Sequence, residues 1–358
     1  MGGEWSEAMY EQVQADVAAL AEDSGDPGKF MGGIVRLCAH DFMDYKAGAW
    51  PRGGPKGCVQ FDDDENAGLS DIWADGTALK DLYDADYAPL GVTIADFWVA
   101  AANGAIAHSS GGILVPSFVW GRADAAECKY NALRLPGAHS CSEVERVFIE
   151  NMRFTWRQAT ALMGAHTIGH ASSNHVGNWV EPAELTAVFD NKLFERDWVP
   201  NAVAADGLAH DWTWGTTESG PKNIMLTTDV CLFYDVETID GTRECCTAAD
   251  LPESGCDAFA EAQCPKVTAG SASRLDGVEA VIEYAEDNDY WLFEFHEAWT
   301  AATTIGLKKQ LYAPVAECTP GGFVPPTEAP TAACSDDASW RARRPSKGAT
   351  RRFTCGTC

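Results

Sequence analysis

The helical spacing of apolar residues is the feature that most constrains the fold of this chain. In the segment 5–22, Met9, Val13 and Val17 recur every four residues, so their side chains share one face of a helix. Strand-like alternation is rare and short. The sequence therefore predicts an all-α fold. Similar spacing predicts helices at 30–45, 69–82, 92–107, 152–163, 184–196, 277–286 and 290–307.

The composition limits which kinds of partner this chain can be expected to bind. The 358 residues include 46% hydrophobic and 22% charged side chains, which is typical of a folded protein. The formal net charge is −27, so a phosphate backbone or an anionic membrane surface would be repelled. We therefore expect no nucleic-acid binding. No run of about 18 apolar residues is present, so we expect no membrane span either.

The C-terminal part differs from the rest. The stretch 320–333 is rich in Pro, Thr and Ala and is typical of a linker. The segment 334–358 carries six Lys or Arg against two Asp, a net charge of +4. The sequence thus predicts a main domain at 1–312, a Pro-rich linker at 313–333 and a basic, Cys-containing tail at 334–358.

Thirteen cysteines favour disulfide bonds, and an odd number leaves at least one thiol unpaired within the chain. The Cys-rich segment 241–265 is expected to be an inserted, disulfide-tied loop. The first residues lack the apolar core of a signal peptide. We expect a mature secreted protein or an incomplete upstream sequence, with an organelle as the alternative.

Three polar residues in the first part of the chain are candidates for a site. Arg36 and His40 lie four residues apart, so a helix would point both side chains the same way. Spacing alone would favour an ordinary Arg–His pair on a helix surface. Asn66 follows in the run Asn-Ala-Gly-Leu, after a Gly-Gly-Pro-Lys-Gly loop at 53–57.

A second set of candidates lies near the middle of the chain. His166 occurs in Gly-Ala-His-Thr-Ile-Gly-His at the end of a predicted helix, where a structural histidine is the alternative. Asp229 lies in Leu-Thr-Thr-Asp-Val-Cys-Leu, where a helix cap would be the simpler interpretation.

Taken together and in this order, these runs resemble the plant, fungal and bacterial haem peroxidase superfamily. They are closest to its first class, the ascorbate and cytochrome c peroxidases. The resemblance implies a two-lobed all-α fold with haem b between a distal lobe (about 1–140) and a proximal lobe (about 141–312). It also implies reduction of H₂O₂ by a small-molecule or aromatic reductant through a ferryl intermediate, in the response to oxidative stress.

The resemblance also assigns roles. His40 would be the acid–base group, Asn66 would fix its tautomer, and Arg36 would stabilise the leaving oxygen. His166 would bind the haem iron, and Asp229 would accept its ring N–H and strengthen it as a ligand.

Some positions depart from the family pattern. Ala39 stands where the family usually has Phe or Trp, so we expect a roomier pocket; a peroxidase-like haem-binding protein with little turnover is therefore the alternative. Trp179 resembles the proximal Trp of the first class, although an insertion separates it from the next motif, and a structural Trp is the alternative. Thr167 and Asp190 would offer ligands to a monovalent cation or Ca²⁺. His175 stands where ascorbate peroxidases bind substrate with Arg, which disfavours ascorbate as the donor.

Overall fold

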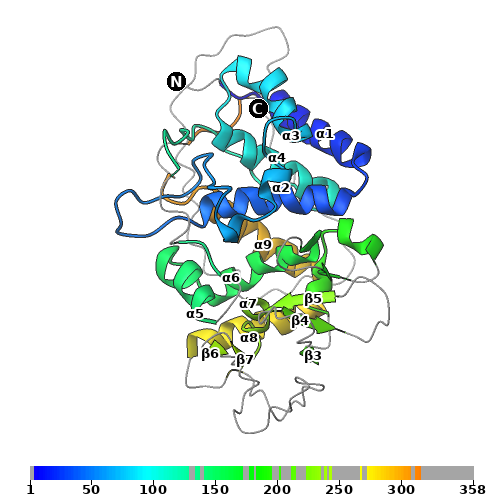
Figure 1. The fold of residues 1–358 in the computed structure, drawn as a ribbon, viewed down its shortest axis with the longest axis vertical. Helices are drawn as coiled ribbons and strands as arrows, with labels where there is room; N and C mark the ends of the chain where they lie inside the picture. Colours follow the sequence, from blue (N-terminus) through cyan, green and yellow to red (C-terminus); the bar gives the residue numbers. More distant parts are fainter. Residues whose placement is uncertain are drawn as a thin grey trace, which may run out of the picture. The chain divides into compact units, whose positions relative to one another are not determined.

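Helices make up most of the computed structural model, which confirms the predicted all-α class (Figure 1). Their bounds are α1 Glu7–Asp23, α2 Pro27–Phe42, α3 Ala78–Leu82, α4 Ile94–Ser109, α5 Cys141–Val144, α6 Trp156–Met163, α7 Thr227–Val230, α8 Ala272–Glu286 and α9 Asn288–Thr303. The structure describes residues 4–128, 134–137, 141–171, 177–180, 183–195, 201–202, 211–214, 223–234, 238–239, 242–243, 267, 272–307 and 311–315.

The first group of helices is α1, α2 and α4, which pack against one another. Each has a polar residue at its N-terminus that accepts a backbone N–H: Ser6 for α1, Asp26 for α2 and Thr93 for α4. Nearly all of α4 is buried, so it forms the centre of this group. Helix α2 carries the predicted Arg36 and His40.

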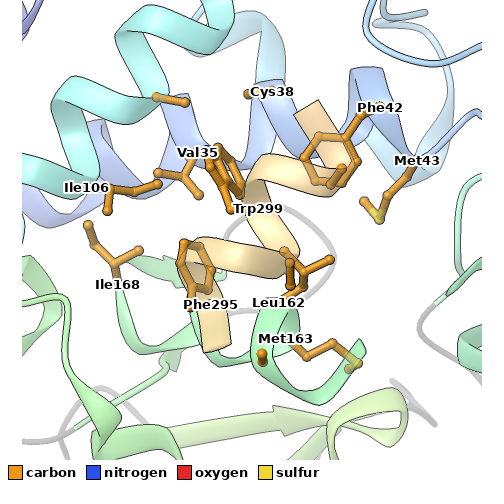
Figure 2. Packing of buried hydrophobic residues seen from close by; sticks show 14 of the residues in the cluster. Val35, Cys38, Phe42, Met43, Ile106, Leu162, Met163, Ile168, Phe295 and Trp299 are labelled. Carbon is orange, nitrogen blue, oxygen red and sulfur yellow. The ribbon is translucent and has the colours of Figure 1, made fainter. Parts of the chain in front are cut away.

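The second group is α6, α8 and α9, which pack against one another, and a side chain of α9 also contacts the first group. Trp299 of α9 packs edge-on against Phe42 of α2 with ring centroids 5.5 Å apart, and its Nε1 donates to Asn103 of α4. Figure 2 shows Trp299 and Phe295 of α9 lying between Val35 of α2 and Leu162 of α6. Helix α9 therefore contacts helices of both groups.

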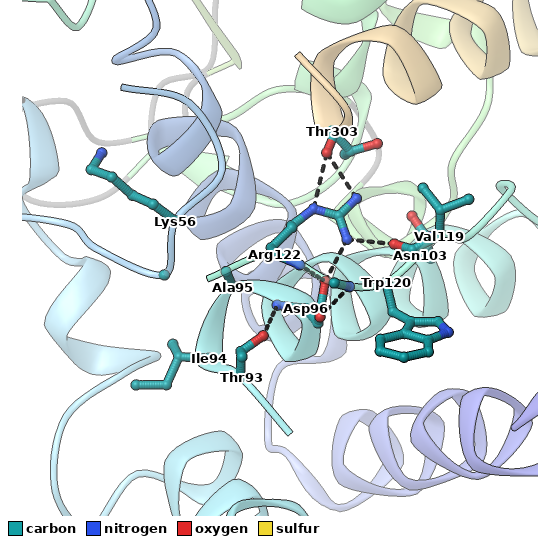
Figure 3. A network of polar contacts seen from close by, with 12 residues as sticks. Lys56, Thr93, Ile94, Ala95, Asp96, Asn103, Val119, Trp120, Arg122 and Thr303 are labelled. Carbon is teal, nitrogen blue, oxygen red and sulfur yellow. Dashed lines mark hydrogen bonds and ion pairs between the residues drawn. The ribbon is translucent and has the colours of Figure 1, made fainter. Parts of the chain in front are cut away.

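A buried ion pair ties the end of α9 to α4 (Figure 3). The Arg122 guanidinium is fully buried and donates to Asp96 at 2.7 Å and to the Thr303 carbonyl oxygen at 2.8 Å and 3.0 Å. A buried charge is tolerated only when its donors are satisfied, and here two elements supply the acceptors.

A small sheet brings together segments that lie far apart in the chain between α6 and α8. Its strands are β1 His170–Ala171, β2 Gly177–Asn178, β3 Asn201–Ala202, β4 Asp211–Trp214 and β5 Asn223–Leu226, in the order β1-β2-β5-β4-β3. Strand β2 runs parallel to β5, with Asn178 opposite Asn223, and the other pairs are antiparallel. A separate hairpin joins β6 Thr238–Ile239 to β7 Thr242–Arg243.

Two predicted helices are wrong as continuous elements. The segment 69–82 contains a 3-10 turn at Leu69–Asp71 and only the short α3, because Gly76 adopts a positive φ of 83° between them. The segment 184–196 contains 3-10 turns at Ala183–Ala187 and Asn191–Leu193, interrupted where Asp190 takes an extended backbone and caps the second turn.

Two disulfides join described residues, Cys58 to Cys128 and Cys141 to Cys231, and Cys38 is a buried free thiol. The second disulfide anchors the turn that follows α7. Most of the predicted Cys-rich loop, the tail at 334–358 and all but the start of the linker lie outside the described residues. The domain boundaries therefore stay predictions.

None of the helices in the described ranges is long and apolar enough to cross a membrane.

Candidate active site

One cavity of about 420 Å³ lies between α2 and the segment that follows α6. Helix α2 contributes Arg36, Ala39 and His40 to its wall. The chain after α6 contributes His166 and Trp179. Much of the remaining wall is apolar, from residues such as Val35, Phe42, Phe148, Leu162, Ile168 and Trp299. The volume lies within the range of about 300–1,000 Å³ that small-molecule and cofactor sites occupy.

His40 is held by Asn66, which the loop after α2 brings behind it. The Asn66 Oδ1 lies 2.8 Å from His40 Nδ1, and Asn66 Nδ2 donates to the Gln60 carbonyl oxygen at 2.8 Å. With its amide so oriented, Asn66 can only accept from the histidine. The Nδ1 of His40 therefore carries the proton, and Nε2 keeps a free lone pair.

The environment of His40 keeps the imidazole neutral. The ring is buried, and burial together with the positive charge of Arg36 lowers the pKa of His40 from 6.5 to about 3. A buried neutral imidazole with one free nitrogen is a group that can take a proton at neutral pH.

Arg36 supplies a fixed positive charge to the same cavity. Its Nη1 donates to the Ala67 carbonyl oxygen and its Nη2 to the Glu65 carbonyl oxygen, both at 2.8 Å. Burial lowers the pKa of Arg36 to about 10, so the guanidinium stays charged at neutral pH. The loop around Asn66 thus orients both the base and the cation.

His166 faces the cavity from a 3-10 turn, Gly164–Thr167, that directly follows α6. The turn requires Gly164, because a Cβ there would lie 2.5 Å from Trp291 and 2.7 Å from Phe194. His166 Nδ1 lies 2.8 Å from Oδ1 of the fully buried Asp229. With Nδ1 engaged, Nε2 is the ring nitrogen that remains to bind a metal.

The small sheet explains how these distant residues meet. Strand β5 leads straight into α7, which carries Asp229, and the Asp229 Oδ2 accepts the Leu226 N–H at 2.9 Å. Strand β2, paired with β5, leads into Trp179. The Trp179 indole lies parallel to the His166 ring, with 3° between the planes and 4.4 Å between centroids. Sequence periodicity missed this sheet because its strands are two to four residues long.

The predicted cation ligands lie close together. Thr167 Oγ1 donates to Asp190 Oδ1 at 3.1 Å, and the Lys192 N–H donates to the same oxygen. Among described residues no group of three or more His, Cys, Asp or Glu side chains could hold a metal ion. His175 lies outside the described residues.

Some cavity residues were not found from the sequence. Trp299 and Phe148 line the cavity but lie in helical segments where an aromatic residue usually signals core. Only their place beside the two histidines, which the fold alone determines, distinguishes them.

Of the histidines that line this cavity, His40 is neutral with a free nitrogen and His166 is backed by a carboxylate, and this pair defines a helical haem-enzyme site. The comparisons agree with this class. The family model described as peroxidase matches residues 13–245, a range that includes His40, His166 and Asp229. The chain therefore belongs to the peroxidase family, and it is a haem peroxidase, an oxidoreductase.

Several known proteins are similar to this chain. A "Putative heme-binding peroxidase" of Gibberella zeae is 27% identical over 66% of this chain and 72% of its own length. A mitochondrial cytochrome c peroxidase of Emericella nidulans is 28% identical over 62% of each chain. A "Probable L-ascorbate peroxidase 5, chloroplastic" of Oryza sativa subsp. japonica is 34% identical over 42% of this chain and 47% of its own. The last two belong to the first class of the superfamily, as expected.

Proposed function

We propose that this protein reduces H₂O₂ to water with His40 as acid–base group and returns to rest by two one-electron oxidations of an organic donor. The hydrogen bond between His40 Nδ1 and Asn66 Oδ1 carries the proposal, because it leaves Nε2 deprotonated inside the cavity. The family and the relatives support a haem cofactor, and the residues present fit one.

The fit rests on the cavity between the two histidines. His166, with Nδ1 committed to Asp229, would bind the iron of haem b through Nε2, and the apolar walls would hold the porphyrin. Bound haem would supply the electrons that cleave the O–O bond. Asp229 would make His166 a stronger donor and so favour that cleavage.

The chain's own residues would move the proton and stabilise the charge. His40 Nε2 would take the proton from one peroxide oxygen and return it to the other as water leaves. Arg36, fixed by the Glu65 and Ala67 carbonyls, would stabilise the negative charge that develops on the departing oxygen. Trp179, which stacks on His166, would be oxidised in turn.

A proximal monovalent cation or Ca²⁺ is part of the proposal. Thr167 and Asp190 would supply two oxygens, and Ca²⁺ requires about six to eight. Further ligands would have to come from backbone carbonyls and water.

The test is haem titration followed by turnover. The protein should bind one equivalent of haem with a Soret band, and His166→Ala should weaken binding and change the band. With H₂O₂, the loaded protein should oxidise at least one donor among phenols, ascorbate, cytochrome c and Mn²⁺. Haem binding without turnover of any donor would favour the alternative suggested by Ala39, a haem-binding protein with little activity.

A further inference from the structure

Helix α9 carries a column of large aromatic residues that ends at the cavity. Trp291, Phe295 and Trp299 recur every four residues and so share one face. The ring centroids are 5.7 Å apart for Trp291 and Phe295, and 5.5 Å apart for Phe295 and Trp299. Trp299 itself lines the cavity, beside Val35 and Leu162 (Figure 2).

The other end of the column continues toward the surface. Trp291 contacts Phe194 at 5.9 Å between centroids, and Phe194 contacts Tyr284 at 5.4 Å. Tyr284 contacts Tyr290 at 5.8 Å. Trp291, Tyr284 and Trp299 are buried, whereas Tyr290 is partly exposed. The rings therefore form an unbroken series from the cavity wall to solvent.

The residue types in this series suit electron transfer. Indole and phenol rings lose an electron much more readily than benzene rings. The two Trp and two Tyr of the series can therefore each be oxidised transiently. Both indole N–H groups have acceptors, Asn103 Oδ1 for Trp299 and the Ala161 carbonyl oxygen for Trp291, which would stabilise an oxidised ring. The Tyr290 hydroxyl accepts a hydrogen bond from Arg157 Nη1 at 3.3 Å. Burial and the Glu294 carboxylate, four residues along the same helix, raise the pKa of Tyr290, and this carboxylate can receive the phenolic proton.

The surface around Tyr290 suits an aromatic donor. Phe293, three residues along the same helix, is 58% exposed, which places an apolar ring on the neighbouring face of α9. A phenol too large to enter the cavity could stack there beside Tyr290.

We propose that Trp299, Trp291, Tyr284 and Tyr290 form an electron path that lets an aromatic donor reduce the enzyme at the surface. The inference rests on the proposed function, which supplies the oxidant when H₂O₂ has oxidised the cofactor. One electron moves inward from Tyr290, whose proton passes to Glu294. The donor phenol then gives one electron and one proton to the Tyr290 radical, which restores tyrosine and leaves a phenoxyl radical. Glu294 releases its proton to solvent and is ready for the next step.

The test maps where the hole arrives. The haem-loaded full chain receives one equivalent of H₂O₂ with a nitroso spin trap and no donor, and peptide mass spectrometry locates the adduct. We expect an adduct on Tyr290 that is lost in Trp299→Phe, in Trp291→Phe and in Tyr290→Phe. Trp5→Phe is the matched control: Trp5 is buried and packs against Phe118, outside the series, so this variant should keep the adduct.

The outcomes separate the two proposals. Absorbance recorded in the same sample reports whether the cofactor reacts with peroxide, and a missing change would remove the oxidant and overturn both. A normal absorbance change without a Tyr290 adduct would overturn the path alone. So would an adduct that persists undiminished in both Trp variants, provided that circular dichroism and haem content show that they fold.

Discussion

At the scale of single residues, burial decides the protonation of His40. Its pKa falls from 6.5 to about 3 because the ring is desolvated and faces Arg36. The rate constant for reaction with H₂O₂ should therefore stay flat from neutral pH down to about 4, since the base form persists. Stopped-flow absorbance measures this rate. A loss of rate that follows a group with a pKa near 6.5 would contradict the assignment.

The lowered pKa of His40 also makes the free energy of unfolding depend on pH. Between pH 6.5 and about 3 the unfolded chain binds a proton at His40 that the folded chain does not, so the free energy of unfolding falls as pH falls. Asp41 acts in the opposite direction, because burial raises its pKa to about 7. Comparing denaturant unfolding of wild type and His40→Gln over this range isolates the histidine. The variant should lose less stability on acidification.

Ala39 sets the room beside the distal base. Its methyl group lines the cavity, so Ala39→Phe would fill space that a donor can use. We expect kcat/KM to drop about ten-fold, or about 1.4 kcal/mol, for phenols that just fit the wild-type cavity, with a smaller effect on the smallest donors. Ala8→Phe, on the exposed side of α1, is the control. Equal kinetics for these cavity-sized phenols in both variants would show that Ala39 does not control access.

At the scale of elements, Arg122 holds α9 against α4. Removing one partner of a buried ion pair leaves the other charge uncompensated, which costs about 3–5 kcal/mol. Arg122→Met should therefore lower the free energy of unfolding by that amount, measured by denaturant titration. Lys80→Met, which removes a more exposed pair with Asp84, should cost under about 1 kcal/mol. Similar losses in the two variants would contradict a special role for the Arg122 cluster.

The long helices could be predicted from the sequence, whereas the short strands could not. Apolar spacing located α1, α2, α4, α6, α8 and α9, because each buries one face or more. The proximal arrangement depended on β2 and β5, whose two to four residues are too short for any periodicity. The positions of His40, Asn66, His166 and Asp229 were predicted from family-like runs. The distances between these side chains could not be predicted, because they depend on how the chain folds. Asp229, for example, lies 63 residues from His166 in the sequence.

At the scale of the whole molecule, the net charge of −27 selects among donors. A field of this sign attracts cations and repels anions, and salt screens it with a Debye length of about 8 Å at 0.15 M. We expect kcat/KM for a cationic aromatic donor to exceed that for an anionic analogue at low salt. Raising the ionic strength should bring the two values together. Salt-independent kinetics for both donors would show that the field does not guide them.

The central claim is that His40 activates peroxide in a cavity where His166 holds the haem. The most direct measurement is stopped-flow absorbance of the haem-loaded protein mixed with one equivalent of H₂O₂, for wild type and His40→Leu. We expect a rapid shift of the Soret band in wild type and a rate about 10²–10⁴ lower in the variant, with haem still bound. An unchanged Soret band in wild type, or equal rates in the two proteins, would contradict it.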